Sequence, residues 1–419
     1  MAGEFGQATG HTAPATVSLF SRPKSAAEIE SSHIVTFEDP ILSINHAAGL
    51  KKLGLWKGEN GSLCLETILE HSRKAGVFIE KVLETFSPDL VVVENVFGLP
   101  LNPGYAEALR RSLVSRNIPA ILRHHDLIWQ RPEFRLERLQ GPLSRLIQAN
   151  FPPRIERAVH VSINRLSKAE LKERGFESFL MYNAFEFPDM LAVGHELEAK
   201  KEQARLRLGI PRSCLLLVQP TRAIERKGVP ESISLGHRLA AELGKEVVLL
   251  VCGPPEDEYD HALAELARGA SSGEQNQKSS GSFRLMLGMG KLPIDLAYEA
   301  ADLVVFPSRW EGFGNPVLES VAFCKPLVVR KYLVLSEICD TGLRFIEWDP
   351  DPLENVLSWS KLDEAVKNRI LSRNLVIAKR WFSIQKQASR LKQILAHLGF
   401  RNGEIRLVNG SAGVELPES

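Results

Sequence analysis

The hydrophobic positions of this chain follow two patterns: short continuous apolar runs, and longer stretches in which apolar residues recur every three or four positions. Short runs rich in valine, isoleucine and leucine are typical of strands buried on both faces of a parallel sheet. These runs lie at 88–94, 119–123, 160–163, 215–219, 246–251, 285–287 and 303–306. Helical spacing predicts helices at 63–86, 105–115, 143–158, 167–174 (capped by Ser167), 196–207, 231–243 and 366–398. The alternation predicts an α/β fold built on parallel sheets.

Two such series follow one another, which predicts two domains. We expect an N-terminal Rossmann-like domain over 1–190, a C-terminal domain over 191–400 and a frayed tail over 401–419. The first ~30 residues are rich in Ala, Ser, Thr, Gly and Pro, which predicts poor order with at most a weak strand at 16–20. We therefore expect this opening segment to be disordered or truncated. The Ser/Gly/Gln-rich stretch at 269–282 predicts a flexible loop.

The composition is that of a globular protein, because 44% of the 419 residues are hydrophobic and 25% are charged. The net charge of +1 excludes bulk electrostatic attraction to nucleic acid. No run approaches the ~20 apolar residues of a membrane span, which leaves peripheral membrane contact open. Five scattered cysteines without C-x-x-C spacing favour neither a disulfide framework nor a zinc site, and predict a reducing, cytoplasmic location.

The segment 307–319 carries the most informative chemistry of the chain. Gly312 and Gly314 permit close approach of a ligand to the backbone, and Asn315 followed by proline predicts a helix that begins at 315 or 316 with Asn315 as its N-cap. The free N–H groups of that helix start suit a diphosphate. Glu319, expected in the first turn, and Glu311, on the loop, can accept hydrogen bonds from ribose and sugar hydroxyls. Alternatively, Glu319 complements the helix dipole and Glu311 is a solvated loop residue.

This run resembles the Glu-x7-Glu signature of the retaining glycosyltransferases of family 4, also called glycosyl transferases group 1, which have the GT-B fold. The resemblance implies two Rossmann-like domains whose sheets face an interdomain cleft, with the last helix crossing back to the first domain. It also implies that Glu311 contacts the donor sugar and Glu319 the ribose. The backbone of 312–317, which includes Phe313 and Val317, would then hold the sugar and phosphates.

A second candidate segment, 220–228, follows the first strand of the C-terminal domain and resembles the Arg-x4-Lys-Gly segment of the same family. Arg222 and Lys227 could each neutralise phosphate, and fixed cations stabilise the charge that grows on a departing nucleoside diphosphate. Gly253, at the end of the next strand, is a further candidate donor contact. The alternative is that both cations are solvated loop residues.

In the N-terminal domain, candidate residues follow the strands at 88–94 and 119–123. Two histidines and Asp126 suggest a metal site, but consecutive residues of an extended chain point to opposite sides and cannot easily converge on one ion. The resemblance aligns His125 with a histidine near the donor sugar; alternatively, its ring is satisfied by backbone. Weaker candidates for the acceptor side are Glu94, which could equally be a capping carboxylate, Asn95, Asp126, Trp129 and Arg131.

The sequence therefore predicts a retaining hexosyltransferase that uses a UDP-, GDP- or ADP-hexose and a small-molecule or glycan acceptor. The resemblance implies no covalent protein nucleophile, and no Asp-x-Asp stands in a metal-binding setting, so we expect neither a metal nor another cofactor. The rival hypothesis is a non-catalytic GT-B protein that binds sugar nucleotides. A nicotinamide-dependent dehydrogenase is disfavoured, because no Gly-x-Gly-x-x-Gly follows a first strand.

Overall fold

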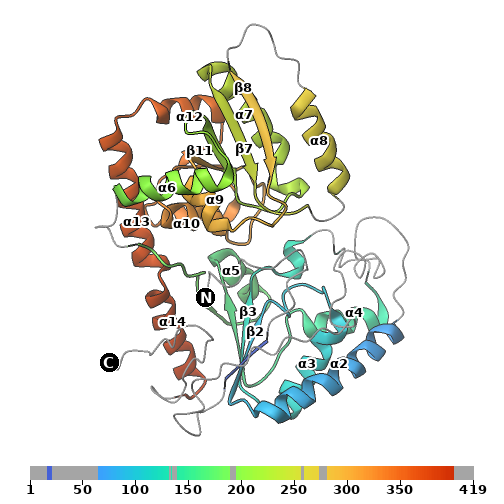
Figure 1. Ribbon diagram of the computed structural model, residues 1–419. Coiled ribbons are helices and arrows are strands. Elements are labelled where there is room, and N and C mark those ends of the chain that lie inside the picture. The colour runs from blue at the N-terminus through green and yellow to red at the C-terminus, as the bar shows by residue number, and fades with distance from the viewer. Residues whose placement is uncertain are drawn as a thin grey trace. The chain divides into compact units, whose positions relative to one another are not determined.

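The computed structural model describes residues 17–20, 65–131, 134, 139–188, 195–255, 259–272 and 281–400. These residues form two compact units, each with its own sheet (Figure 1). The C-terminal unit is Asn183–Lys386, and the N-terminal unit contains the described residues up to Tyr182 together with those from Gln387 onward. The chain thus changes unit between 182 and 183, where the sequence suggested 190, and it returns to the N-terminal unit near its end.

The N-terminal unit is built on a five-stranded sheet in the order β1-β2-β3-β4-β5. Strand β1 lies at the position of the weak predicted strand and pairs antiparallel with β2, whereas the other neighbours are parallel. The strands are β1 (Val17–Phe20), β2 (Leu90–Glu94), β3 (Ala120–His124), β4 (Ala158–Ser162) and β5 (Ser178–Leu180). The helices are α2 (Leu65–Phe86), α3 (Pro103–Ser115), the 3-10 helix η3 (Ile128–Gln130), α4 (Gly141–Asn150), α5 (Arg165–Glu173) and α14 (Ile384–His397).

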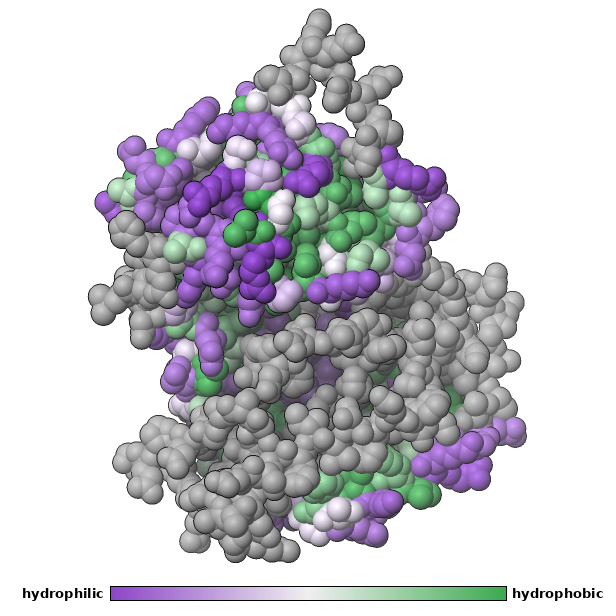
Figure 2. Space-filling model, viewed as in Figure 1, coloured by the Kyte–Doolittle hydropathy of each residue, from purple (hydrophilic) through white to green (hydrophobic). Residues whose placement is uncertain are grey.

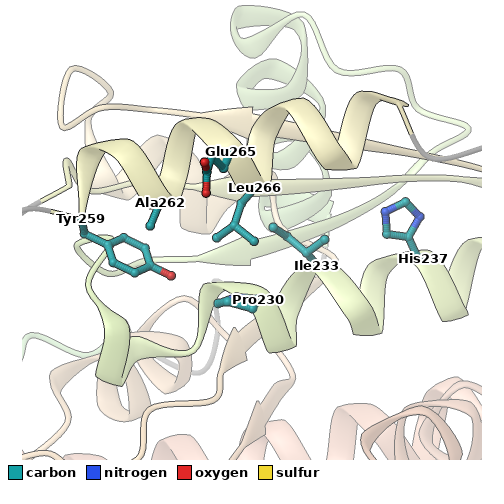
Figure 3. A pocket seen from close by; sticks show the side chains of 7 residues that line it. All are labelled: Pro230, Ile233, His237, Tyr259, Ala262, Glu265 and Leu266. Atoms are coloured by element: carbon teal, nitrogen blue, oxygen red, sulfur yellow. The ribbon is translucent and has the colours of Figure 1, made fainter.

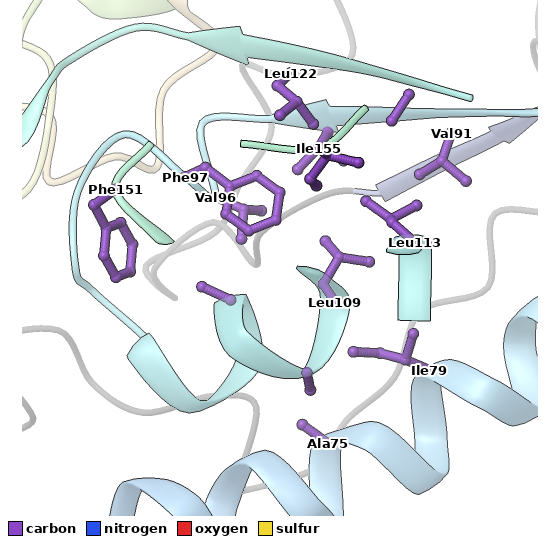
Figure 4. Packing of buried hydrophobic residues seen from close by; sticks show 14 of the residues in the cluster. Ala75, Ile79, Val91, Val96, Phe97, Leu109, Leu113, Leu122, Phe151 and Ile155 are labelled. Carbon is purple, nitrogen blue, oxygen red and sulfur yellow. The ribbon is translucent and has the colours of Figure 1, made fainter. Parts of the chain in front are cut away.

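Alternating side chains of the central strands build a core on each face of this sheet. Val91 of β2 packs in a large cluster with α2 and α3 (Figure 4), whereas its neighbour Leu90 packs with Ile394 and Leu395 of α14 on the other face. Burial on both faces explains why β2 reads as a continuous apolar run rather than as an alternating one.

The C-terminal unit has a six-stranded parallel sheet in the order β11-β10-β9-β6-β7-β8. The strands are β6 (Leu215–Gln219), β7 (Glu246–Val251), β8 (Ser282–Leu287), β9 (Leu303–Phe306), β10 (Leu327–Val329) and β11 (Ile346–Glu347). The helices are α6 (His195–Leu208), η7 (Glu225–Lys227), α7 (Val229–Leu243), α8 (Asp260–Ser272), α9 (Ile294–Ala300), α10 (Asn315–Ala322), α11 (Leu333–Cys339), α12 (Pro352–Ser360) and α13 (Glu364–Phe382). Strands β7 and β8 are added in turn on one side of β6, whereas β9, β10 and β11 are added in turn on its other side.

Two helix predictions in the N-terminal unit are wrong in detail. The helix expected over 143–158 ends at Asn150, because Pro152 and Pro153 soon follow and proline cannot continue a helix. Helix α5 is capped by Asn164 and not by Ser167: the Asn164 Oδ1 accepts a hydrogen bond from the Ser167 backbone N–H at 2.6 Å.

The single helix expected over 366–398 is also wrong, because Ser383 divides it into α13 and α14. Ser383 is extended (φ −73°, ψ 158°), and its hydroxyl accepts a hydrogen bond from the Lys386 N–H at 3.3 Å, near the start of α14. The Phe382 carbonyl, at the end of α13, accepts a hydrogen bond from the Phe185 N–H at 2.9 Å. The break therefore lies where the chain passes from one unit to the other.

The loop expected at 269–282 begins later than predicted, because α8 continues to Ser272. Residues 273–280 of that loop, the tail at 401–419 and the first ~30 residues apart from β1 lie outside the described residues, and Ser282, the predicted end of the loop, begins β8. No helix within the described ranges is long and apolar enough to cross a membrane.

Candidate active site

The C-terminal unit brings two of the predicted loops together at one edge of its sheet. Strands β6 and β9 are neighbours, and the chain progresses outward from them in opposite directions. In an open α/β sheet such a switch point leaves a crevice at the carboxyl ends of the two strands, where ligands bind. The loop after β6 carries Arg222 and Lys227, the loop after β9 carries Glu311, and a hydrogen bond from the Arg309 N–H to the Arg226 carbonyl (3.0 Å) joins the loops.

Glycines fix the path of the loop after β6. Gly228 ends η7 in the left-handed region (φ +69°), and a Cβ there would lie 3.0 Å from the Pro307 ring, at the start of the other loop. A Cβ on Gly253, after β7, would lie only 2.6 Å from the backbone of Arg222. Gly253, predicted as a donor contact, therefore supports the Arg222 backbone by close packing, while the Arg222 side chain is exposed.

A buried ion pair joins the two loops. The Lys227 Nζ donates to the Glu311 Oε1 at 2.5 Å, and both side chains are about one tenth exposed. Arg226 approaches the same carboxylate oxygen at 3.4 Å. Burial lowers the pKa of Lys227 from its usual 10.5 to about 8, although the nearby Glu311 carboxylate opposes this shift. The sequence assigned both residues to phosphate and sugar; in this structure they contact each other.

The helix start after β9 forms as predicted, but with a different cap. Helix α10 begins at Asn315, and Gly314 is its N-cap in the left-handed region (φ +91°), so the prediction of Asn315 as N-cap is wrong. A Cβ on Gly314 would lie 2.0 Å from the Tyr332 hydroxyl, which donates to the Phe313 carbonyl at 3.0 Å. The backbone must pass too close to Tyr332 for any other residue. The Asn315 side chain instead accepts a hydrogen bond from Asn183 at 2.7 Å.

Two other predicted donor contacts on this segment have buried side chains. Phe313 is 3% exposed and packs edge-on against Phe382, with the ring centroids 6.0 Å apart, and Val317 is fully buried. Only the backbone of these residues could therefore face a ligand. The buried side chains of Phe313 and Val317 thus anchor this segment, and the backbone amides of 312–317 are its candidate groups for a phosphate.

Glu319 lies in the second turn of α10, not in the first as predicted. Its Oε2 accepts a hydrogen bond of 2.6 Å from the hydroxyl of Tyr298, on α9. Burial raises the pKa of Glu319 from 4.5 to about 6, and Tyr298 opposes this by stabilising the charged form. The sequence did not identify Tyr298, and only its place in an amphipathic stretch before β9 could have suggested it.

In the N-terminal unit, the residues after β2 and β3 form a second group. The His125 Nε2 contacts the Glu94 Oε1, and Arg123 donates to the same oxygen at 2.7 Å. Burial alone would raise the pKa of Glu94. Arg123 and His125 have the larger opposite effect, so the pKa lies below its ordinary value. The His125 ring is thus bound by a carboxylate and not by backbone.

Asn95 clasps the start of the loop after β3. Its backbone is left-handed (φ 56°), and its Oδ1 accepts from the N–H groups of His125 (2.9 Å) and Asp126 (3.3 Å). Arg131 donates to Asp126 at 2.8 Å. The indole of Trp129 donates to Glu170 at 3.1 Å, so Trp129 is tied to α5.

His124 and His125 point to different partners, as the alternation of an extended chain requires. The His124 ring is buried and lies 2.9 Å from His160 of β4, nitrogen to nitrogen. Burial holds the pKa of His124 well below 6.5 and lowers that of His160 to about 4, which keeps both rings neutral. Across the described part of the chain, no three His, Cys, Asp or Glu side chains are placed to hold a metal ion.

One pocket of the C-terminal unit contains none of the predicted residues. Its volume is about 570 Å³, and it lies between α7 and α8 (Figure 3), where hydrophobic residues also gather on the face shown in Figure 2. It is lined by Pro230, Ile233, His237, Tyr259, Ala262, Glu265 and Leu266.

Comparisons with known proteins agree with this fold and these motifs. The family model described as glycosyl transferases group 1 matches residues 200–375, which contain Arg222, Lys227, Glu311 and Glu319. The mannosylglucosylglycerate synthase of Thermotoga maritima is 29% identical over 350 residues, which are 74% of this chain and 75% of that protein. The mannosylglucosylglycerate synthase of Petrotoga mobilis is 27% identical, and the match covers 61% of this chain and 63% of that protein, slightly under two thirds of its length.

Among solved structures, Anabaena Alr3699/HepE in complex with UDP and glucose has a TM-score of 0.57 at 16% identity, covering 80% of this chain and 83% of that one. A likeness at this identity bears on the fold, and it confirms the prediction of two α/β domains of the GT-B type. Together, the domain match, the relatives and the fold support a glycosyltransferase.

Proposed function

We propose that this GT-B glycosyltransferase transfers a hexose from a UDP-, GDP- or ADP-sugar to a small acceptor, and that the anomeric configuration of the hexose is retained. The observation that carries the proposal is the buried Lys227–Glu311 pair at the switch point between β6 and β9. An ammonium for phosphate and a carboxylate for sugar hydroxyls lie side by side there, which suits the two chemically different halves of a sugar diphosphate.

The same loops would stabilise the leaving group. When the glycosidic bond to the nucleotide breaks, negative charge grows on the terminal phosphate, so a cation fixed in advance binds the transition state more strongly than the ground state. Lys227 is held in place by Glu311, and Arg222 lies on the same loop, where its backbone packs closely against Gly253. The amides at the start of α10 add partial positive charge. In this proposal Glu311 positions the hexose, and the departing phosphate takes the acceptor proton on the same face.

The N-terminal unit would supply the acceptor side and one further sugar contact. His125, oriented by Glu94 and by the clasp of Asn95, would position hydroxyls at the reacting centre. The names of the two relatives describe products that contain mannosyl, glucosyl and glycerate groups, which favours a mannosyl donor and a small, negatively charged saccharide acceptor such as glucosylglycerate. Arg131, paired with Asp126, is the candidate contact for the acceptor carboxylate.

The test is a transfer assay with purified protein, in which GDP-mannose, UDP-glucose and ADP-glucose are each offered with glucosylglycerate, and the product is analysed by NMR. The anomeric coupling of the new bond, compared with that of the donor, reports retention or inversion. Donor binding without turnover of any acceptor, and without slow donor hydrolysis, would instead favour the rival function, a non-catalytic sugar-nucleotide-binding protein.

Lys227→Gln and Glu311→Gln should abolish transfer while leaving circular dichroism unchanged. Lys325→Gln is a matched control, because Lys325 is a partly buried lysine whose pKa is also lowered to about 8. It lies just before β10, at the amino ends of the strands, and donates to the Glu299 carbonyl of α9 at 2.8 Å. Full activity of both site variants would refute the assignment.

A further inference from the structure

Tyr298 is fully buried on α9, and its hydroxyl has one polar partner in the described structure, the Oε2 of Glu319 at 2.6 Å. Its ring is stacked on Phe323, with centroids 5.0 Å apart and planes 6° from parallel. Stacking and burial hold the ring in one rotamer, so the hydroxyl is a fixed donor directed at the Glu319 carboxylate.

A carboxylate has two oxygens, and this contact occupies only one of them. An ionised carboxylate accepts from the hydroxyls of a ribose more strongly than a neutral amide or a protonated carboxyl does, so the charge state and the orientation of Glu319 both matter. Four titratable groups face Glu319: Tyr298 and Asp295 from α9, Lys227 from η7 and Cys252 after β7. Among the residues that the structure describes, Tyr298 is the one that donates a hydrogen bond to it.

We propose that Tyr298 is a positioning residue, which holds Glu319 so that the free oxygen of the carboxylate receives the ribose of the donor. This inference rests on the proposed function, because it takes a nucleotide sugar as the ligand. Tyr298 does not touch the ligand: it acts through Glu319.

Removing the hydroxyl would have two effects. The carboxylate would lose the donor that fixes its rotamer, and its burial would no longer be offset by a hydrogen bond. The pKa of Glu319 would therefore rise further, because that hydrogen bond lowers it. Both effects weaken the contact between Glu319 and the ribose, and the second does so most at acidic pH.

The test combines Tyr298→Phe, which preserves the stacked ring, with removal of one hydroxyl from the ligand. Binding of UDP-glucose or GDP-mannose, whichever wild type binds more tightly, is compared by calorimetry with binding of its 2′-deoxyribose counterpart. A hydrogen bond to a charged group predicts that the missing hydroxyl weakens wild-type binding roughly tenfold, and that this penalty falls to about threefold or less in Tyr298→Phe. Tyr105→Phe, which alters a partly buried tyrosine of the N-terminal unit, should keep the full penalty.

The pH profile separates positioning from a merely structural role. Between pH 5.5 and 7.5 the loss of binding in Tyr298→Phe should grow as the pH falls, whereas a structural defect would weaken binding equally at every pH. Nucleotide sugars suit this measurement because their esterified diphosphate does not titrate in this range. The pH dependence attributed to Glu319 should disappear in Glu319→Gln. If Tyr298→Phe does not fold, Tyr298→Met, which also lacks the hydroxyl, takes its place in the test.

The two proposals fail in different ways. If wild type binds no nucleotide sugar, the proposed function is wrong and this inference falls with it. If wild type binds and shows the ribose penalty, but Tyr298→Phe shows the same penalty at every pH, only the role of Tyr298 is refuted.

Discussion

Replacing Glu319 with glutamine should make the C-terminal unit more stable at neutral and alkaline pH, although we expect it to weaken donor binding. The pKa of Glu319 is raised by burial from 4.5 to about 6, which means that the folded state resists ionisation of this carboxyl. A group whose folded pKa lies above its unfolded pKa destabilises the fold once the pH exceeds both values. Glutamine keeps the shape and the contact with Tyr298 but carries no charge.

The size of the effect follows from the shift. A difference of about 1.5 units, at about 1.4 kcal/mol per unit, predicts that ionisation of Glu319 costs about 2 kcal/mol at pH 8. At pH 5 the folded carboxyl is mostly protonated, and the cost falls to less than half of that. For a unit of about 200 residues, 2 kcal/mol corresponds to a rise of about 4–8 °C in Tm.

Differential scanning calorimetry at pH 8 and pH 5 tests this prediction. A nucleotide sugar added to wild type marks the transition of the unit that binds it, and that transition should shift upward in Glu319→Gln at pH 8 and much less at pH 5. Glu242→Gln, at an exposed position of the same unit, should shift neither. An equal shift at both pH values, or a loss of stability at pH 8, would refute the reasoning.

Three further predictions concern the site. A plot of donor affinity against pH should be bell-shaped. Affinity should fall below about pH 6, where Glu319 is protonated, and above about pH 8, where Lys227 loses its charge. Calorimetric Kd values that do not change between pH 5.5 and 8.5 would contradict both assignments. Gly314→Ala should cost at least ~1–3 kcal/mol in urea unfolding, because φ is +91° and the new Cβ meets a hydroxyl at 2.0 Å, whereas Gly209→Ala (φ +64°, open space) should suffer backbone strain alone. Asn95→Ala should lower kcat more than tenfold with little change in donor Kd, since it releases the backbone of the loop after β3; an unchanged kcat would contradict this.

The sequence predicts the longer central strands best, because burial on both faces leaves a continuous apolar run of four to six residues. The three-residue strand β10 (Leu327–Val329) is also buried but was not predicted. Strands β6, β7 and β9 have the predicted bounds. The short edge strand β5 has no such run: its side chains are only half-buried, and neither of its ends carries a strong turn signal. The break between α13 and α14 was also hidden, since a serine within a helical pattern rarely announces that the chain changes unit there.

In the candidate site, too, local sequence signals could be predicted and contacts set by tertiary packing could not. Glycines, prolines and charged residues that follow strands identify the two loops after β6 and β9, so Lys227 and Glu311 could be found without coordinates. Partners set by packing could not: Tyr298 reaches Glu319 because α9 lies beside α10, and nothing in the spacing of the two residues records that contact. The cap was mispredicted for a related reason: position 314 requires glycine because a Cβ there would clash with Tyr332, a residue 18 positions later in the sequence.

In the proposed site, the ion pair between Lys227 and Glu311 would make binding selective before any ligand arrives. A small inorganic anion that draws Lys227 away would leave Glu311 buried without its counter-charge, and an uncompensated buried charge typically costs about 3–5 kcal/mol. A neutral sugar that draws Glu311 away would leave the Lys227 ammonium buried without its counter-charge. A molecule that carries both phosphate and hydroxyl groups would give Lys227 and Glu311 a new partner at the same time. We therefore expect the phosphate half and the sugar half of the donor, offered separately, to bind much more weakly than the whole molecule.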